Sequence, residues 1–359
     1  MNTATGGRLQ RLSGVHTLGL SVLLLATALV LAATQGAYAL GGGRLVGLLW
    51  DGAGGTLAGL PGELAVDAQV FFNIRLPRVL LGVAAGAGLA VAGALMQGIF
   101  RNPLADPGLI GVSSGAALAA ALTIVLGAAW WPDAPRTLGS WTLVASAFAG
   151  GMAVTAVVYT LSQAEAGARV GMMLLAGIAI NAVAGAGLGL LSYMATDEQL
   201  RSLQFWLLGS LGGARWSAVG LVCGLVVLAL AWALPLARSL NALSLGEAQA
   251  SLLGVDVHRL QRRAVLAAAV AVGAVTATTG IIGFVGLVAP HVVRLVAGPD
   301  HRVLLPASAL LGAALVLLAD AAARTLAQPA ELPLGVLTAL LGGPFFLLLL
   351  RATGGRAWR

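Results

Sequence analysis

The chain has 359 residues, of which 59% are hydrophobic and only 9% charged, a composition that excludes a soluble globular domain. Its formal net charge of +7 comes from arginine alone, because the sequence contains no lysine. A Walker A loop needs a lysine on the nucleotide phosphates, so any ATP that drives this protein must be bound by another subunit.

The N-terminal segment can be interpreted in two ways. Arg8 and Arg11 precede an apolar run over residues 17–33, and the sequence AYA at 37–39 has the form of a signal-peptide cleavage site. The run is longer than the core of a typical signal peptide and nearly spans a bilayer. We therefore favour an uncleaved first membrane helix over residues 15–36.

Further apolar runs, each close to the roughly 20 residues that span a bilayer, predict an all-α polytopic membrane protein. Ten membrane elements are expected, over residues 15–36, 70–100, 108–129, 138–162, 169–193, 215–236, 263–288, 290–297, 302–326 and 333–351. Most arginines then fall on one side, and the positive-inside rule makes that side the cytoplasm, with both termini in it. The arginines form no basic stripe with interleaved aromatic residues, which argues against a nucleic-acid partner.

The segment RNPLADPGLIGVSSG at 101–115 interrupts two apolar runs. Pro103 and Pro107 disfavour helix just before themselves, and Asp106 before Pro107 is typical of a helix N-terminus. One helix should therefore end near Phe100, and the next should begin near Gly108.

Two polar segments are expected to form short structures outside the membrane. Thr196 and Gln199 predict a capping box that starts a short amphipathic helix. In the second segment, over residues 240–263, Ser244 with Glu247 predicts another capping box, so that two short cytoplasmic helices are expected there. Gly254 should end the first of these helices, and Asp256 should cap the second. Arg259, Arg262 and Arg263 share one helix face, which a basic collar at the membrane surface would also explain.

Three arginines and one aspartate are expected on the opposite side of the membrane. Arg75, Arg78 and Arg324 lie at helix ends there, and Asp320, one turn before Arg324, is expected to form a structural ion pair. The second to fifth and the seventh to tenth predicted helices are expected to form two similar blocks of opposite orientation, each with a glycine-rich helix that is broken by a turn, at Pro103 in one and at Pro290 in the other. Inverted repeats of this kind are typical of transporters.

Together, RLPR at 75–78, the 101–115 segment and GIIGFVGLVAPHVVR at 280–294 resemble the permease subunits of the ABC importers for iron chelates, heme and vitamin B12. The resemblance runs from about residue 70 to 351. It implies an inverted-repeat type II importer permease, a single transmembrane domain over 1–359 that acts as a homodimer in the bacterial inner membrane. Two ATPase subunits that bind ATP and Mg, one periplasmic binding protein and surrounding lipid would be its partners.

The resemblance also implies roles for individual residues. Arg75, Arg78 and Arg324 would pair with acidic residues of the binding protein. Asn102 and Leu104 would help close the cytoplasmic end of the pathway, and Arg201 would face an anionic substrate at the entrance. The 240–263 segment would dock into the ATPase through Ser244, Glu247, Leu252, Arg259, Arg262 and Arg263.

No catalytic or metal motif stands out, so we expect neither enzymatic activity nor a cofactor or metal bound by this chain. A single cysteine, Cys223, excludes a disulfide framework, and His291 is a lone histidine next to Pro290. The segments RNPLADPGLIGVSSGAALAA at 101–120 and LRSLQFWLLGSLGGA at 200–214 resemble heme permeases most, which implies heme as the first expected cargo, before ferric siderophores and vitamin B12. A proton-driven transporter would need a relay of acidic or histidine side chains within the membrane, and Asp320 alone does not make one. A membrane enzyme would need clusters of metal-binding carboxylates, which the sequence does not show.

Overall fold

The computed structural model describes residues 12–36, 38, 41–53, 62–130, 139–163 and 169–357. Arg8, Arg11 and parts of the AYA sequence at 37–39 lie outside these residues. The described part of the chain is helical: α1 (Gly14–Thr34), α2 (Gly42–Ala53), α3 (Gly62–Gln69), α4 (Leu76–Ile99), α5 (Val112–Trp130), α7 (Trp141–Ser162), α8 (Arg169–Met194), α9 (Asp197–Leu208), α10 (Trp216–Ala233), α11 (Ala237–Leu243), α12 (Glu247–Leu252), α13 (Val257–Thr279), α14 (Val285–Ala297), α15 (His301–Thr325) and α16 (Leu334–Ala357).

Among the described residues, seven helices are long and apolar enough to cross a membrane. They cover Gly14–Thr34, Leu64–Ile99, Trp141–Ser162, Val170–Met194, Trp216–Leu243, Val257–Thr279 and His301–Thr325. Shorter apolar helices cover Val112–Gly127, Val285–Ala297 and Leu334–Leu348. Each predicted element overlaps one of these helices, of which seven are long enough to cross a membrane, whereas α2 and α3 were not predicted.

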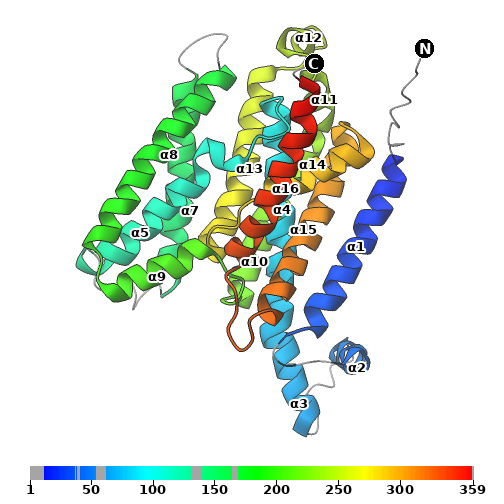
Figure 1. The fold of residues 1–359 in the computed structure, drawn as a ribbon, viewed down its shortest axis with the longest axis vertical. Helices are drawn as coiled ribbons and strands as arrows, with labels where there is room; N and C mark the ends of the chain where they lie inside the picture. The colour runs from blue at the N-terminus through cyan, green and yellow to red at the C-terminus, as the bar shows by residue number, and fades with distance from the viewer. Residues whose placement is uncertain are drawn as a thin grey trace.

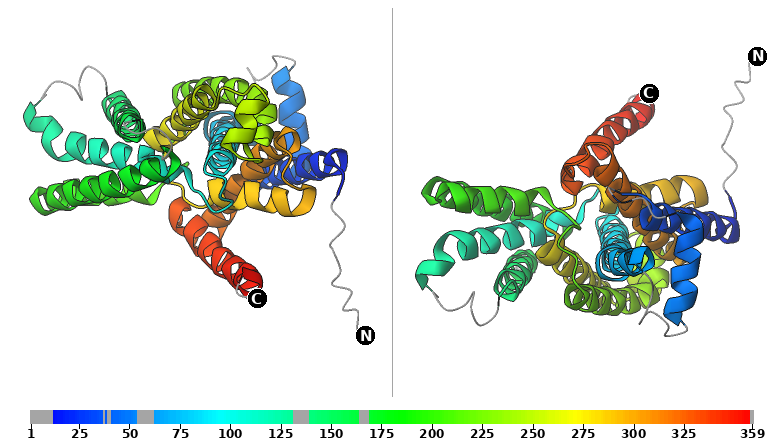
Figure 2. Two further views of the ribbon diagram at one scale, coloured as in Figure 1. Left: turned by 90° about the horizontal axis from the view of Figure 1, so that it is seen from above. Right: turned by 90° about the horizontal axis from the view of Figure 1, so that it is seen from below.

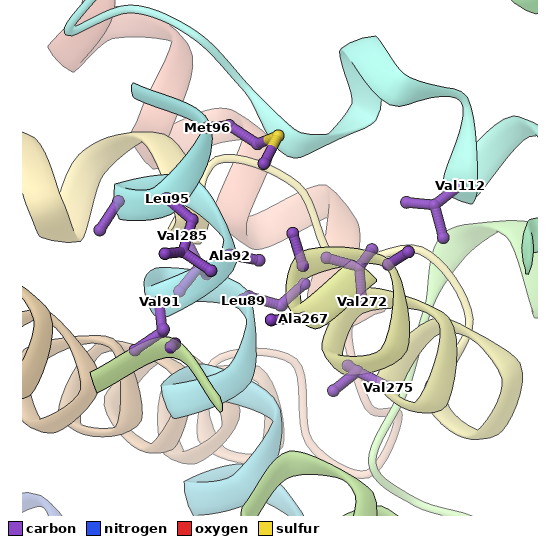
Figure 3. Packing of buried hydrophobic residues seen from close by; sticks show 14 of the residues in the cluster. Leu89, Val91, Ala92, Leu95, Met96, Val112, Ala267, Val272, Val275 and Val285 are labelled. Atoms are coloured by element: carbon purple, nitrogen blue, oxygen red, sulfur yellow. The ribbon is translucent and has the colours of Figure 1, made fainter. Parts of the chain in front are cut away.

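α4 is the central helix of the bundle, and almost all its residues are buried. Helices α10, α13, α14 and α15 surround it, while α5, α7 and α8 form a group that extends to one side (Figure 1, Figure 2). Figure 3 shows Leu89, Ala92 and Met96 of α4 in the same apolar core as Ala267 and Val272 of α13. We call the two ends of the bundle the α12 end and the α9 end, after the helices that lie there in Figure 1.

Glycines allow the central helices to approach closely. A Cβ atom at Gly86 would lie 2.2 Å from the carbonyl oxygen of Gly312 in α15. One at Gly93 would lie 1.7 Å from the carbonyl oxygen of Gly286 in α14. Both distances are far below contact, so only glycine permits this packing at these positions.

The predicted break after Phe100 is confirmed. α4 ends at Ile99, and a 3-10 turn over Pro107–Ile110 precedes α5. The Asp106 side chain accepts a hydrogen bond from the Gly108 N–H at 2.7 Å, as expected of a helix cap.

The predicted break at Pro290 is wrong. The chain leaves the helix at Gly280, and α14 runs through Pro290 without interruption from Val285 to Ala297. Gly280 and Phe284 both have positive φ, which helical residues do not adopt. Pro290 has no N–H to offer the carbonyl of Gly286, four residues earlier, and that carbonyl faces Gly93 of α4 instead. The close packing of the two helices thus accommodates the proline inside α14.

The 240–263 segment also differs from the prediction. α10 and α11 continue as one helix to Leu243, so Ser244 lies at a C-terminus, where its hydroxyl donates to the Asn241 carbonyl at 2.6 Å. The Ser244–Glu247 capping box is therefore wrong, and Gly246 occupies the N-cap of α12. Only α12 is a separate short helix, because the helix that Asp256 caps, as predicted, is the long α13. Arg259, Arg262 and Arg263 lie within α13.

Candidate functional site

The three arginines predicted to dock a partner are buried at the α9 end, where α4 begins and α15 ends. Arg78 and Arg324 contact Asp320, whereas Arg75 lies beside Arg324, since both guanidinium groups border Gly36. The Arg78 Nε donates to both oxygens of Asp320, at 3.0 and 3.1 Å, and Arg324 Nε donates to the same carboxylate at 3.0 Å. Asp320 therefore forms the ion pair predicted for it, with two arginines rather than one. We call Arg75, Arg78, Asp320, Arg324 and Glu331 the arginine cluster.

The arginine cluster also fixes the C-terminal end of α1. Arg324 donates to the carbonyls of Ala32 at 3.0 Å and Gln35 at 2.7 Å. Arg75 donates to the carbonyls of Thr34, at 2.9 Å, and of Ala33 and Tyr38. Cations favour the negative end of a helix dipole and satisfy carbonyls that lack intrahelical partners. α1 is thereby an integral part of the bundle.

Glu331 is the exposed member of the arginine cluster. It lies between α15 and α16, its side chain is 48% exposed, and its two oxygens accept from Arg78 Nη1 at 3.0 Å and Nη2 at 2.9 Å. The hydrogen bonds from Arg78 hold the pKa of the Glu331 carboxyl below its usual value. Sequence analysis missed Glu331, although an acid directly before a Leu-Pro pair at the start of an apolar run is a detectable signal.

Arg201 is separate from the arginine cluster. It lies exposed on α9, whose predicted Thr196–Gln199 capping box is confirmed. A surface hollow of about 460 Å³ beside it is lined by Asp197, Gln204 and Phe205 among other residues of the same helix. This hollow could admit a small anionic group next to the guanidinium.

Asn102 and Leu104 lie at the α12 end, in the turn that follows α4. Asn102 is exposed, and its side-chain oxygen accepts from the Leu104 N–H at 3.0 Å, which fixes the turn. Asn181 of α8 donates to the Gly108 carbonyl at 3.3 Å farther along the same connection. Sequence analysis did not identify Asn181, a polar residue in the middle of an apolar helix.

The predicted coupling residues lie at the same α12 end. Leu252, on α12, has 88% of its surface exposed, although it is a large apolar residue outside the apolar runs. Ser244, Arg259, Arg262 and Arg263 are exposed as well, and Glu247 is partly exposed in the first turn of α12. The structure thus separates the predicted docking residues from the predicted coupling residues by the length of α4, whose 24 residues correspond to about 36 Å.

In the described part of the chain, no group of three or more His, Cys, Asp or Glu side chains that could hold a metal ion lies together. His291 lies in the middle of α14 and not at a helix break, with its ring edge-to-face with Phe345 at a centroid distance of 6.4 Å. Cys223 is half-buried in α10.

Comparison with known proteins assigns the chain to a transport family. Residues 23–352 match the FecCD transport family. The hemin transport system permease protein of Yersinia pestis is 45% identical over 282 residues, which cover 79% of this chain and 83% of the relative. The vitamin B12 import system permease protein of Escherichia coli is 40% identical over 312 residues, 86% of this chain and 93% of the relative.

A solved structure supports the same assignment. An inward-facing conformation of a metal-chelate type ABC transporter superposes with a TM-score of 0.80 at 34% identity, covering 94% of this chain and 99% of the other.

Proposed function

The chain belongs to the FecCD transport family, and from that premise we propose that it is the permease subunit of an ATP-driven importer that carries heme into the cytoplasm. The 45% identity to a hemin permease over most of both chains carries the choice of heme. Ferric siderophores and vitamin B12 are the alternative cargoes, and the vitamin B12 relative favours the latter. ATP hydrolysis belongs to separate ATPase subunits, in agreement with the absence of lysine.

We propose a complex of two copies of this chain, two ATPase subunits that bind ATP and Mg, and one periplasmic binding protein. The whole chain, 1–359, then forms one transmembrane domain of ten helices with inverted repeats in the bacterial inner membrane. The α12 end is cytoplasmic, as are both termini, and the basic residues there agree with the positive-inside rule. The α9 end faces the periplasm.

The sites follow this arrangement. Arg75, Arg78 and Arg324 receive acidic residues of the binding protein, and Arg201 meets the anionic groups of the cargo at the entrance. Asn102 and Leu104 belong to the cytoplasmic gate. The 240–263 segment couples the permease to the ATPase through Ser244, Glu247, Leu252, Arg259, Arg262 and Arg263, and the exposure of Leu252 supports this role.

The test is uptake into proteoliposomes that contain the permease with its ATPase, supplied with the binding protein and one cargo at a time. We expect ATP-dependent uptake of heme and little uptake of a ferric siderophore or vitamin B12. Preferred uptake of either of the other cargoes would refute heme as the substrate. Uptake that follows a proton gradient and needs no ATPase would refute the importer itself.

A further inference from the structure

Asn241 connects the coupling segment to the start of α15. It lies in α11, three residues before the turn that leads to α12. Its side-chain oxygen accepts from the His301 backbone N–H at 2.9 Å and pairs with His301 Nδ1 at 2.8 Å. Its amide nitrogen donates to Asp300 Oδ1 at 2.6 Å. One side chain thus makes three hydrogen bonds to the first residues of a helix 60 positions away in the sequence.

The neighbours of Asn241 determine its orientation. The backbone N–H of His301 requires the amide oxygen on its side, and the Asp300 carboxylate requires the amide nitrogen on the other. Asp300 is an anion at neutral pH, because hydrogen bonds from the Arg302 N–H and from Asn241 lower the pKa of its carboxyl. Since the amide oxygen can only accept, the proton on His301 lies on Nδ1.

His301 also contacts the central helix. It is buried, and its Nε2 would lie 2.8 Å from a Cβ atom at Gly98, near the end of α4. Leu240, beside Asn241, borders the same position of Gly98. The His301 ring is therefore held between α4 and α11, and Asn241 determines where it lies.

α15 extends from this contact to the other end of the bundle. Its 25 residues correspond to about 37 Å, and its last turns carry Asp320 and Arg324 of the arginine cluster. Apolar contacts between helices permit sliding, whereas three directional hydrogen bonds fix the register of α11 against α15. A displacement of α12 by a bound subunit would therefore be passed to α15 through Asn241.

We propose that Asn241 is a positioning residue that transmits movement of the coupling segment to α15 and thereby couples ATP hydrolysis to opening of the pathway. This role rests on the proposed function as an ABC importer permease. It adds a specific connection, Asn241 to Asp300 and His301, between the ATPase contact and the transmembrane helices.

The decisive variants exchange the two polar partners. Asn241→Asp keeps an acceptor for His301 but places a carboxylate against that of Asp300, and two like charges in contact repel each other. Asp300→Asn alone keeps an acceptor for the Arg302 N–H, since asparagine is as good an N-cap as aspartate, and serves as the control. The double variant again pairs an amide with a carboxylate.

Two readouts are needed, because replacing a side chain that only capped α15 would change the stability of the protein and not its coupling. The first is heme imported per ATP hydrolysed in proteoliposomes. The second is the stimulation of ATP hydrolysis by the binding protein, measured without cargo. We expect Asn241→Asp to lower both roughly fivefold, the order expected for loss of one hydrogen bond. Unstimulated hydrolysis and the melting temperature should stay near those of wild type, Asp300→Asn should have little effect, and the double variant should recover most of both readouts.

Three results would overturn the proposal: normal stimulation in Asn241→Asp, a loss that the double variant does not reverse, or a parallel fall of stability and all activities. The failure of the proposed cargo is distinguishable from these results. In that case wild type would import no heme, while the stimulation of hydrolysis would still report on Asn241.

Discussion

At the scale of single residues, Arg78 shows why burial matters for the proposed docking site. Its guanidinium pairs with the buried Asp320 on one edge and the half-exposed Glu331 on the other. Breaking a buried ion pair by removing one partner costs about 3–5 kcal/mol, whereas an exposed pair contributes about 0–1 kcal/mol. Reversing the charge of Arg78 would therefore disturb the fold as well as docking, and Glu331 is the better position for an experiment.

A docking carboxylate must compete with Glu331 for the Nη1 and Nη2 donors of Arg78. We expect Glu331→Gln to strengthen binding of the periplasmic protein severalfold, because a neutral amide competes less well for a guanidinium. Surface plasmon resonance at several salt concentrations measures this. Glu198→Gln, on exposed α9 at the same end, is the control for the general loss of a negative charge. An equal gain in the control would contradict the exchange.

The same pair predicts a pH dependence of stability. The folded-state pKa of Glu331 lies below the ordinary value of 4.5, so the pair stabilises the fold at pH values above 4.5. That contribution is lost as the pH falls through the lowered pKa. We expect wild type to melt slightly above Glu331→Gln at neutral pH, with the difference vanishing in acid. A difference that is independent of pH would show that the carboxylate charge does not matter.

At the scale of helices, close backbone contact organises the centre of the bundle. α4 meets α15 at Gly86 and Gly312, and it meets α14 at Gly93 and Gly286. In a bilayer, association between helices depends on such packing. Lipid is as apolar as the side chains, so burying apolar surface between two helices contributes little free energy. Glycines on α8 differ among themselves: Gly177 lies against the Leu109 carbonyl, whereas Gly185 faces open space.

These contacts predict opposite results for two glycine substitutions. Gly93→Ala places a methyl group 1.7 Å from the Gly286 carbonyl oxygen, and overpacking of this kind costs about 1–3 kcal/mol or more. We expect a clearly lower melting temperature in detergent. A Cβ atom at Gly185 would have no neighbouring atom within 4 Å. Gly185→Ala should therefore be neutral or slightly stabilising, since alanine is the better helix former. Equal effects of both would contradict the packing described for α4 and α14.

At the scale of the whole molecule, the bundle carries two candidate interaction surfaces at opposite ends. The arginine cluster lies at the α9 end, because Arg75 and Arg78 are at the start of α4 and Arg324 is in the last turn of α15. α12, which carries the exposed Leu252, lies at the opposite end of the bundle (Figure 1). α4 and α15 run between them and are packed against each other. An importer needs this separation, because it receives its cargo on one side of the membrane and its energy on the other.

Leu252 provides a test of the proposed ATPase contact. Because its side chain is 88% exposed, Leu252→Asp should leave the melting temperature of the isolated permease unchanged. We expect it to reduce co-purification of the ATPase subunit strongly, since it places a charge in an apolar contact. Leu326→Asp, at a leucine that is 67% exposed after α15, is the matched control at the other end and should not affect co-purification. Normal assembly of Leu252→Asp would remove α12 from the proposed interface.

The sequence by itself determined the features that depend on neighbouring residues. Apolar runs defined the membrane helices, and local side-chain chemistry defined the caps at Asp106, Thr196 and Asp256. The tertiary structure decided the rest, because those features depend on contacts between distant residues. Glu331 reaches Arg78 across 253 positions, Asn241 reaches His301 across 60, and the Gly286 carbonyl, left free by Pro290, faces α4. Local patterns contain no information on such pairs, since helix packing brings them together.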